Sequence, residues 1–422
     1  MRAVHAAVAA GLLLRLAFGL GYWTGKPLTQ DEREYLALAA NVAHGRGFAT
    51  ELPGEAAPAG NVQRFGRGPG YPLFLAPLTW LDADLRAGRL PDGVPAAVKV
   101  VQAIAGAAAI LVLASLVRRV AGDRAGVAAA WLAALFPPLV WMPAYALSEQ
   151  LASLLALGCA AWLGAVTDGT PAARDARGGT TRALIAAGLA AGAGALTRPG
   201  QLFVLPLAAL LLIWRAPDRR AGLRRALLFT ALALLAIAPW TLRNAIAYRQ
   251  FVPIASSGGV NFWIGNHPEA IGDGDLAANP QLKLRNAEFR AAHAGLPEEA
   301  LERLYYRDAA RAIAADPVRW LGLEGRKLWY TFVPFGPSYR LHAPRYFWTS
   351  AVSLLLLLPA AIYGIARTAS GSRPAALLTL AAASVLAGLV FFPHERFRLP
   401  VMDPALIAAA ALSASRGRDA LV

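Results

Sequence analysis

Long apolar runs that contain almost no charged residues recur along the chain and constrain its fold more than any other feature. The first extends from Val4 to Tyr22, and a helix of that length, at about 1.5 Å per residue, crosses the hydrocarbon core of a membrane. The chain has 422 residues, of which 57% are hydrophobic and only 16% charged, a balance that soluble proteins of this size rarely show. The sequence therefore predicts an all-α polytopic membrane protein.

Basic residues indicate which loops face the cytoplasm. Arginines gather in short loops between the apolar runs, most densely from Arg215 to Arg225, as the positive-inside rule expects. This pattern predicts about ten spans with both termini in the cytoplasm. Arg15 lies within the first span, so we expect it to face the protein interior or a wet cavity. The expected spans are residues 4–22, 98–117, 125–141, 151–166, 183–196, 202–214, 226–240, 348–365, 375–392 and 399–414.

Two polar regions interrupt the spans on the outer side. The first, residues 23–93, is expected to contain a short helix over 32–43 and a segment over 73–81 that is too short to span. The second, residues 243–335, carries an amphipathic, charged helix and then an aromatic, basic stretch over 320–335 that is expected on the membrane surface. The chain thus divides into an N-terminal transmembrane module (1–242), a small periplasmic region (243–335) and C-terminal transmembrane helices (336–422).

Charge and cysteine content narrow the function classes. The formal net charge is +15, but the arginines lie in the short loops that membrane topology requires, which argues against a nucleic-acid partner. Cys159, the one cysteine, lies in an apolar run, so the chain can form neither an intramolecular disulfide nor a thiolate metal site. No two histidines have the spacing of zinc ligands on one helix. The first apolar run precedes no small-residue cleavage site, so we interpret it as a retained helix.

Ionisable residues from several outer loops converge on one face of the expected bundle. Charged groups at a membrane edge are costly, so such a gathering indicates a site for a polar, anionic substrate. Arginine suits phosphate because its planar fork donates two hydrogen bonds at once. The residues are Asp31, Glu32, Arg64, Arg67, Glu149, Arg198, Arg243, His267, His394, Glu395, Arg396 and Arg398.

Some of these residues also have a purely structural interpretation. Thr29 and Glu32 have the spacing of a helix-capping box, and acids in a first helical turn complement the helix dipole in any protein. The pair Ser148-Glu149 is equally suited to cap the fourth span. Arg198 and Arg243 are typical of interface anchors. The residues alone leave both interpretations open.

Short motifs follow one another along the chain, the first an acidic pair directly after the first span. In order they are Asp31-Glu32, Arg67-Gly68-Pro69-Gly70-Tyr71-Pro72, Ser148-Glu149, Thr197-Arg198-Pro199, Pro239-Trp240-Thr241-Leu242-Arg243-Asn244, Gly258-Gly259-Val260-Asn261-Phe262-Trp263-Ile264-Gly265-Asn266 and Arg396-Phe397-Arg398-Leu399-Pro400. Their order and spacing, over nearly the whole chain, resemble the polyprenol-phosphate-dependent glycosyltransferases with the membrane fold called GT-C. The resemblance is to the bacterial branch related to protein O-mannosyltransferases and lipid A aminoarabinose transferases.

The resemblance implies roles for individual residues. Asp31 matches the family's essential acid of the first outer loop, and Glu149 matches its second outer acid. Arg67 and Arg398 match basic residues that contact the donor phosphate. The chain has Gly68 where the family usually has proline, which predicts a looser turn there. The full candidate set is Asp31, Glu32 and Glu149 for catalysis and Arg64, Arg67, Tyr71, Arg198, Arg243, Arg396 and Arg398 for the donor phosphate.

The resemblance implies transfer of a sugar from a polyprenyl-phosphate donor to a lipid, glycan or protein acceptor of the cell envelope. Asp31 would act as base or as the acid that orients the acceptor, at the periplasmic face of a bacterial inner membrane. No residue set is assigned to a metal, although a divalent ion between Asp31 and Glu149 stays open. Two alternatives are a lipid-linked saccharide transporter or flippase and a surface-polysaccharide polymerase or ligase. The absence of an internal repeat disfavours the transporter.

Overall fold

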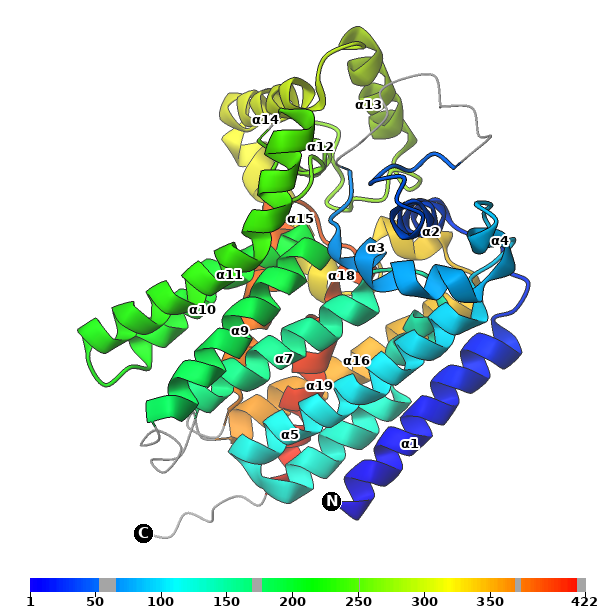
Figure 1. Cartoon of the computed structure of the whole chain (residues 1–422). Helices are drawn as coiled ribbons and strands as arrows, with labels where there is room; N and C mark the ends of the chain where they lie inside the picture. The colour runs from blue at the N-terminus through cyan, green and yellow to red at the C-terminus, as the bar shows by residue number, and fades with distance from the viewer. Residues whose placement is uncertain (53–65, 169–176, 250, 369–372, 416–422) are drawn as a thin grey trace.

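The computed structural model describes residues 1–52, 66–168, 177–249, 251–368 and 373–415. Within these ranges every regular element is a helix, which confirms the all-α prediction. Long helices pack side by side in a slanted bundle, and several shorter helices cover one end of it, the upper end in Figure 1. The N-terminus lies at the opposite, lower end (Figure 1).

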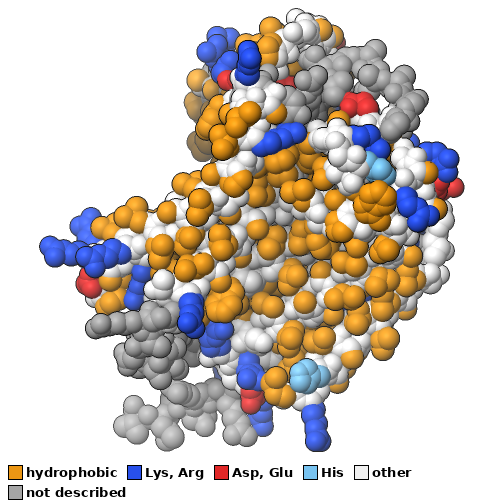
Figure 2. Space-filling view, viewed as in Figure 1, with side chains coloured by type: hydrophobic (Ala, Val, Ile, Leu, Met, Phe, Trp, Pro, Cys, Tyr) orange, Lys and Arg blue, Asp and Glu red, His pale blue; other side chains and the backbone are white. Residues whose placement is uncertain are grey.

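Apolar helices long enough to cross a membrane form the body of the bundle. Hydrophobic side chains cover its side, whereas Lys and Arg gather toward the two ends (Figure 2). That distribution suits a chain surrounded by lipid at mid-height. Within the described residues the long apolar helices are Arg2–Tyr22, Ala96–Leu135, Glu149–Thr167, Arg219–Ala247 and Pro344–Arg367, and shorter ones are Pro199–Trp214, Ala375–Val390 and Met402–Ala414.

The first helix packs along the longest helix of the bundle. Helix α1 (Arg2–Leu16) continues as a π-helical turn, η1 (Ala17–Tyr22), and packs along α5 (Ala96–Leu135). Helix α5 contains the second predicted span, 98–117, and most of the third, 125–141, whose last residues form α6 (Pro137–Trp141). Between the two spans the chain kinks at Gly122, whose φ of 87° glycine adopts at little cost. Arg15 is 3% exposed and donates to backbone carbonyls of α1 and α5, so the prediction that it faces the interior is confirmed.

Short helices of the first polar region lie across the upper end. They are α2 (Gln30–Ala43), α3 (Gly70–Leu75), η2 (Ala76–Leu81) and α4 (Ala83–Arg86). The predicted helix over 32–43 is therefore present. Residues 73–81 lie within two short helices that pack on α2 instead of crossing the bundle. Their shared core includes Tyr35, Leu36 and Tyr71.

The middle of the chain supplies further bundle helices. Helix α11 is longer than the predicted span over 226–240, because Pro239 lies inside it without ending it. Its upper part rises above the bundle beside the cap (Figure 1). The elements in order are α6 (Pro137–Trp141), η3 (Met142–Ala144), α7 (Glu149–Thr167), α9 (Arg177–Thr197), η4 (Pro199–Phe203), α10 (Val204–Trp214) and α11 (Arg219–Tyr248).

The second polar region forms a helical cap. It contains α12 (Gly258–Asn266), α13 (Pro280–Ala292), α14 (Glu298–Ala315) and α15 (Pro317–Phe332). Lys327 of α15 is fully buried, while Val318, Leu321 and Trp329 on the same helix are largely exposed. The remaining elements are η5 (Pro337–Leu341), α16 (Pro344–Arg367), α17 (Ala375–Val390), α18 (Glu395–Arg398), α19 (Met402–Ala411) and η7 (Leu412–Ala414).

Candidate functional site

The start of helix α2 fixes the position of the first acidic pair. The Thr29 hydroxyl accepts from the Glu32 amide at 3.4 Å, and a Glu32 carboxylate oxygen accepts from the Thr29 amide at 2.8 Å. The predicted capping box is therefore confirmed. The second Glu32 oxygen accepts from the Ala146 amide at 3.0 Å, which fastens α2 to the segment before α7. Glu32 thus supports the helix, and the Asp31 carboxylate points to other partners.

Two arginines from distant parts of the chain hold the Asp31 carboxylate. Arg67 Nη2 donates to Oδ1 at 2.5 Å, and Arg396 Nη1 donates to Oδ2 at 3.0 Å. Arg67 lies in the loop before α3, and Arg396 lies on α18 near the other end of the sequence. Each oxygen of Asp31 is therefore paired with its own guanidinium group.

Glu149, the first residue of α7, lies on the other side of Arg396. Its Oε1 atom accepts from Nε of Arg396 at 2.9 Å and lies 2.9 Å both from Nη2 of Arg396 and from Nη1 of Arg198. The side chain is 1% exposed, so this carboxylate is nearly removed from water. Ser148 makes no side-chain cap bond to α7, which removes the capping interpretation of Ser148. Arg396 therefore bridges Asp31 and Glu149 directly.

A third carboxylate completes the group. Glu34, one helical turn after Asp31 on α2, accepts from Nε of Arg67 at 2.7 Å. We call Asp31, Glu34, Glu149, Arg67, Arg198 and Arg396 the carboxylate–arginine cluster. Its carboxylates and guanidinium groups are equal in number, so its formal charges balance.

Close packing of glycine positions the Arg67 loop. A β-carbon on Gly70 would lie 2.5 Å from the Thr197 hydroxyl oxygen, and one on Gly68 would overlap the Leu196 carbonyl. Both contacts are with the upper end of α9, directly before Arg198. The prediction of a looser turn at Gly68 is wrong, because only a residue without a side chain fits this contact. Arg67 and Arg198 are thereby brought to one place.

Aromatic rings lie against the guanidinium groups. The Arg67 guanidinium is 5.1 Å from the centre of the Tyr35 ring, and that of Arg198 is 4.8 Å from the Phe397 ring. Such contacts orient arginine side chains and exclude water from one face of each. The Tyr35 hydroxyl donates to Ser148 at 3.4 Å, which joins α2 to the start of α7.

The cluster shifts the ionisation of its members. Burial opposes ionisation of Asp31, but the charges of Arg67 and Arg396 and their hydrogen bonds outweigh it and lower its pKa to about 2. Burial also opposes the charge of Arg396, yet Glu149 and Asp31 raise its pKa above the usual value. In this arrangement Asp31 is a stable carboxylate and a weak base.

Two other candidate residues have partners of their own. Arg398 is buried, and its Nε lies 3.5 Å from Asp403 of α19. The Tyr71 hydroxyl is fully buried and donates to Gln102 of α5 at 2.9 Å. Neither side chain is placed by these contacts beside Asp31. Arg398 and Tyr71 therefore stay predictions as donor contacts, with structural partners already in place.

Two further arginines belong to the candidate set. Arg243, near the end of α11, donates to Asn244 at 3.0 Å and lies over the Trp240 ring. These contacts resemble those of an interface anchor more than those of a phosphate ligand. Arg64 lies outside the described residues.

The space between Asp31 and Glu149, where a divalent ion was left open, contains the Arg396 guanidinium group. Within the described ranges, no set of three or more His, Cys, Asp and Glu side chains is arranged to hold a metal ion. A metal in this position would have to replace Arg396 as the partner of both carboxylates.

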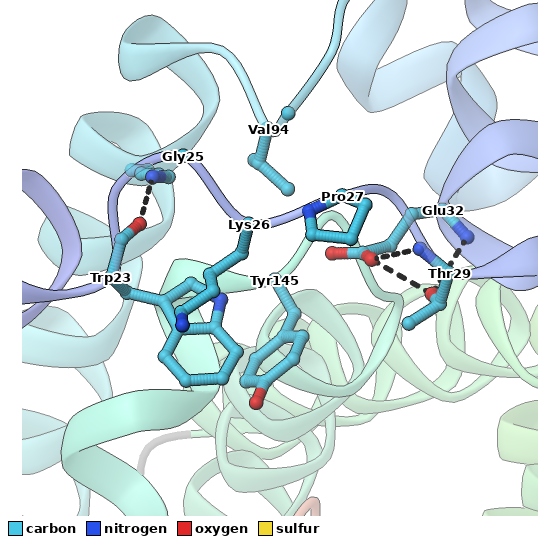
Figure 3. A pocket seen from close by; sticks show the side chains of 10 residues that line it. Trp23, Gly25, Lys26, Pro27, Thr29, Glu32, Val94 and Tyr145 are labelled. Carbon is cyan, nitrogen blue, oxygen red and sulfur yellow. Dashed lines mark hydrogen bonds between the residues drawn. The ribbon is translucent and has the colours of Figure 1, made fainter.

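A pocket opens beside the capping box. It lies between the loop after α1 and the first turn of α5 and includes both Thr29 and Glu32 (Figure 3). Sequence reasoning missed this pocket and also missed Glu34 and Tyr35. For the latter two a signal existed, because residues three and four positions after Asp31 lie on the same face of a helix.

Comparison with known proteins identifies a related family. Residues 90–242, about a third of the chain, match the family described as dolichyl-phosphate-mannose-protein mannosyltransferase. Among curated proteins, no sequence matches this chain.

Solved structures of an archaeal oligosaccharyltransferase share the fold. The archaeal oligosaccharyltransferase AglB from Archaeoglobus fulgidus, in complex with an inhibitory peptide and a dolichol-phosphate, matches with a TM-score of 0.56 and 17% identity over 97% of this chain. The Archaeoglobus fulgidus oligosaccharyltransferase tethered to an acceptor peptide matches with a TM-score of 0.56 and 18% identity over 97% of this chain. The chain spans about half the length of these proteins, 50% and 49%. ArnT from Cupriavidus metallidurans bound to undecaprenyl phosphate matches with a TM-score of 0.43 and 15% identity over 98% of this chain and 78% of ArnT. The family match and the shared fold confirm the resemblance to GT-C glycosyltransferases.

Proposed function

We propose that this chain, which has the GT-C fold and a glycosyltransferase family match, transfers a sugar from a polyprenyl-phosphate donor to an envelope acceptor. The observation that carries the proposal is Asp31, held between Arg67 and Arg396 at the upper end of the bundle. A carboxylate beside arginines supplies both a proton acceptor and donors for a phosphate in one place. AglB was solved with a dolichol-phosphate, which supports a lipid-phosphate donor here.

In the proposed reaction the donor phosphate takes hydrogen bonds from Arg67 and Arg396. The cluster is charge-balanced, so an arriving anion has to compete with a carboxylate for these guanidinium groups. Asp31 shares both arginines, and their loss as partners would leave it partly desolvated without its counter-charges. Its pKa then rises and its basicity increases. Donor binding would in this way convert a weak base into an effective one.

The chemical step follows from that arrangement. The acceptor hydroxyl oxygen attacks the anomeric carbon, its proton passes to Asp31, and the bond from that carbon to the phosphate oxygen breaks. Polyprenyl phosphate leaves with both bonding electrons, and the arginines stabilise the added negative charge. The sugar is transferred with inversion in a single displacement. General-base assistance of this kind contributes about 10² to 10⁴ in rate. Glu149 keeps Arg396 in place from its buried side.

Release of polyprenyl phosphate tests the proposal. Purified protein in nanodiscs receives a polyprenyl-phosphate sugar with a labelled lipid, together with envelope extract as the source of acceptor. Wild type should release labelled polyprenyl phosphate, and Asp31→Asn should abolish release while still binding the donor. The matched control is Asp84→Asn, because Asp84 on α4 is an exposed acid that also pairs with an arginine, Arg89. Substantial transfer by folded Asp31→Asn would remove Asp31 from the mechanism. The same assay with a metal chelator added decides whether transfer needs a divalent metal.

We also propose that the upper end faces the periplasm of a bacterial inner membrane. The loops predicted to face the cytoplasm are short and rich in arginine, most densely from Arg215 to Arg225, which supports this orientation through the positive-inside rule. A cysteine at exposed Gln281, on α13 of the cap, should react in intact spheroplasts with a membrane-impermeant maleimide. Reaction only after lysis would show that the cap faces the cytoplasm instead. Buried Cys159 provides the internal control, because it should not react in the folded protein.

A further inference from the structure

Arg15 lies inside the bundle, on the first apolar helix, and has no acidic partner. Its side chain is 3% exposed, and its Nη1 and Nη2 atoms donate to the carbonyls of Gly11, at 2.9 Å, and Ala133, at 3.2 Å. In the part of the chain that the structure describes, Arg15 forms no ion pair, and its buried Nε atom has no hydrogen-bond partner. Buried charges are normally paired, so this guanidinium group favours a partner that the chain itself does not supply.

A small cavity adjoins Arg15. It lies between α1, α5, α7 and the start of α19, and every residue that lines it is buried. Ile110, Leu113 and Leu157 give it an apolar side. The cavity volume is about 20 Å³, enough for one particle of about the size of a water molecule. An organic ligand is therefore too large, whereas a single water molecule or a monatomic ion fits.

Polar side chains of α7 face the cavity opposite Arg15. Gln150 and Ser153 both line it, and each is 2% exposed. Neither side chain makes a hydrogen bond to any described residue. The Gln150 amide can turn its NH₂ group toward the cavity, and the Ser153 hydroxyl is also a donor. Together with Nε of Arg15, these groups supply donors from two helices and no carboxylate.

Gly106 of α5 shows that two of these groups flank the same spot. A β-carbon on Gly106 would lie 2.8 Å from Nε of Arg15 and 3.2 Å from Oε1 of Gln150. The absence of a side chain at this position therefore keeps the approach to Nε open. A particle beside Gly106 lies within reach of both α1 and α7.

We propose that this cavity binds a monatomic anion, such as chloride, on the guanidinium group of Arg15. An anion accepts hydrogen bonds from Arg15, Gln150 and Ser153 and cancels the buried positive charge. A water molecule satisfies the same donors but leaves that charge without a counter-charge. A cation is repelled by Arg15. The size of the cavity excludes sulfate, phosphate and carboxylates.

The anion would act as a fastener between helices. It joins α1 to α7, and the residue before Gln150 is Glu149, which holds Arg396. The inference does not depend on the proposed transfer, because it rests on the contacts of Arg15 alone. Its test therefore measures binding and stability and requires no turnover.

Thermal unfolding in chloride tests the inference. Protein in nanodiscs is heated in sodium gluconate that is replaced stepwise by sodium chloride at constant sodium concentration; gluconate is too large for the cavity. Gly106→Ala keeps Arg15 but places a methyl group against Nε. Gly158→Ala on α7 is the matched control, because a β-carbon there meets no atom within 4 Å. Arg15→Met, which removes the charge, replaces Gly106→Ala if that variant fails to fold.

The thermal midpoint of wild type should rise with chloride and then saturate, by about 1 to 3 °C at ten times the dissociation constant. Gly158→Ala should show the same rise, whereas Gly106→Ala and Arg15→Met should show none. Crystals soaked in sodium bromide should give an anomalous scattering peak between Arg15 and Gln150. Equal wild-type midpoints in gluconate and chloride, with no bromide peak, would overturn the inference and leave water as the occupant. A chloride effect that persists in folded Gly106→Ala or Arg15→Met would overturn it as well, because chloride would then act elsewhere.

Discussion

Arg396 and Arg398 lie two residues apart on the short helix α18 and reach different partners. Arg396 contacts Asp31 and Glu149, whereas Arg398 is buried beside Asp403. Residues two positions apart on a helix do not face the same side, which accounts for the separation. The two arginines should therefore have different functions, one in the site and one in the fold.

Substitution of Arg398 should destabilise the protein without changing donor affinity. Arg398→Met leaves Asp403 buried and unpaired, a change that costs about 3 to 5 kcal/mol for ion pairs of this kind. The double variant Arg398→Met/Asp403→Leu should recover most of that loss. Thermal midpoints and the donor KM of all three proteins provide the measurement. A double variant that is stable but has a donor KM raised tenfold would instead assign Arg398 to the phosphate.

Substitution of Arg396 should act on transfer itself. Arg396→Lys keeps the charge but cannot bridge Asp31 and Glu149 with a planar fork. We expect kcat to fall by about 10² to 10³, in the range of a lost transition-state hydrogen-bond donor. Arg303→Lys, an exposed arginine on α14, serves as the control. An Arg396→Lys protein with wild-type kcat would contradict the phosphate role.

The ionisation of Asp31 predicts two different pH profiles. In the resting cluster its pKa is about 2, below the usual value, so its charge contributes stability above about pH 4 that is lost as the pH falls toward 2. The profile of kcat/KM for the donor reports the free enzyme and should show no acid limb from Asp31 above about pH 4. The kcat profile reports the donor complex, in which Asp31 has lost its arginines, and its acid limb should lie higher. Identical limbs in both profiles would argue against displacement of Asp31 by the donor.

The variant Tyr71→Phe tests whether Tyr71 supports the fold or contacts the donor phosphate. Its fully buried hydroxyl donates to Gln102, and its ring packs edge-on against Tyr35. Tyr71→Phe keeps the ring and removes one buried hydrogen bond, which should lower the stability by about 1 kcal/mol. The donor KM should stay unchanged in membranes where the variant is folded. A donor KM raised without a loss of stability would restore Tyr71 as a phosphate contact.

Local signals in the sequence predicted much of the fold. Apolar runs located the main helices, and the Thr29 to Glu32 spacing predicted the start of α2, because a capping box is formed by neighbouring residues. No helix was predicted over residues 258–266, which form α12. Packing of Trp263 and its bond to Asp308 of α14 stabilise that helix, and such contacts between distant residues are not visible in a local pattern.

The sequence predicted most members of the site but not which of them pair. Asp31, Arg67, Glu149 and Arg396 were all candidates, and the structure brings them together. The choice of Arg396 over Arg398 depends on the direction from which the four-residue helix α18 approaches α2, which only the tertiary structure specifies. The pocket was missed for the same reason, since its walls come from three separate segments.

The contact between His342 and Glu395 connects the position of α18 to pH. Their side chains form an ion pair between the segment after η5 and the first residue of α18. A hydrogen bond to Glu395, opposed by burial, raises the pKa of His342 above its usual value. Burial opposes ionisation of Glu395, but His342 and its neighbours outweigh it and lower the pKa of Glu395. Glu395 therefore stays charged above about pH 5, and His342 is the group of this pair that loses its charge as the pH rises above its usual pKa.

Because the folded pKa of His342 is raised, the stability it contributes is fully present below about pH 6.5 and is lost as the pH rises through the folded value. His342→Gln should therefore lower the thermal midpoint at pH 6, and the difference from wild type should shrink toward pH 9. His5→Gln, at an exposed position at the start of α1, is the matched control. A difference that stays constant from pH 6 to 9 would show that His342 acts through packing and not through its charge.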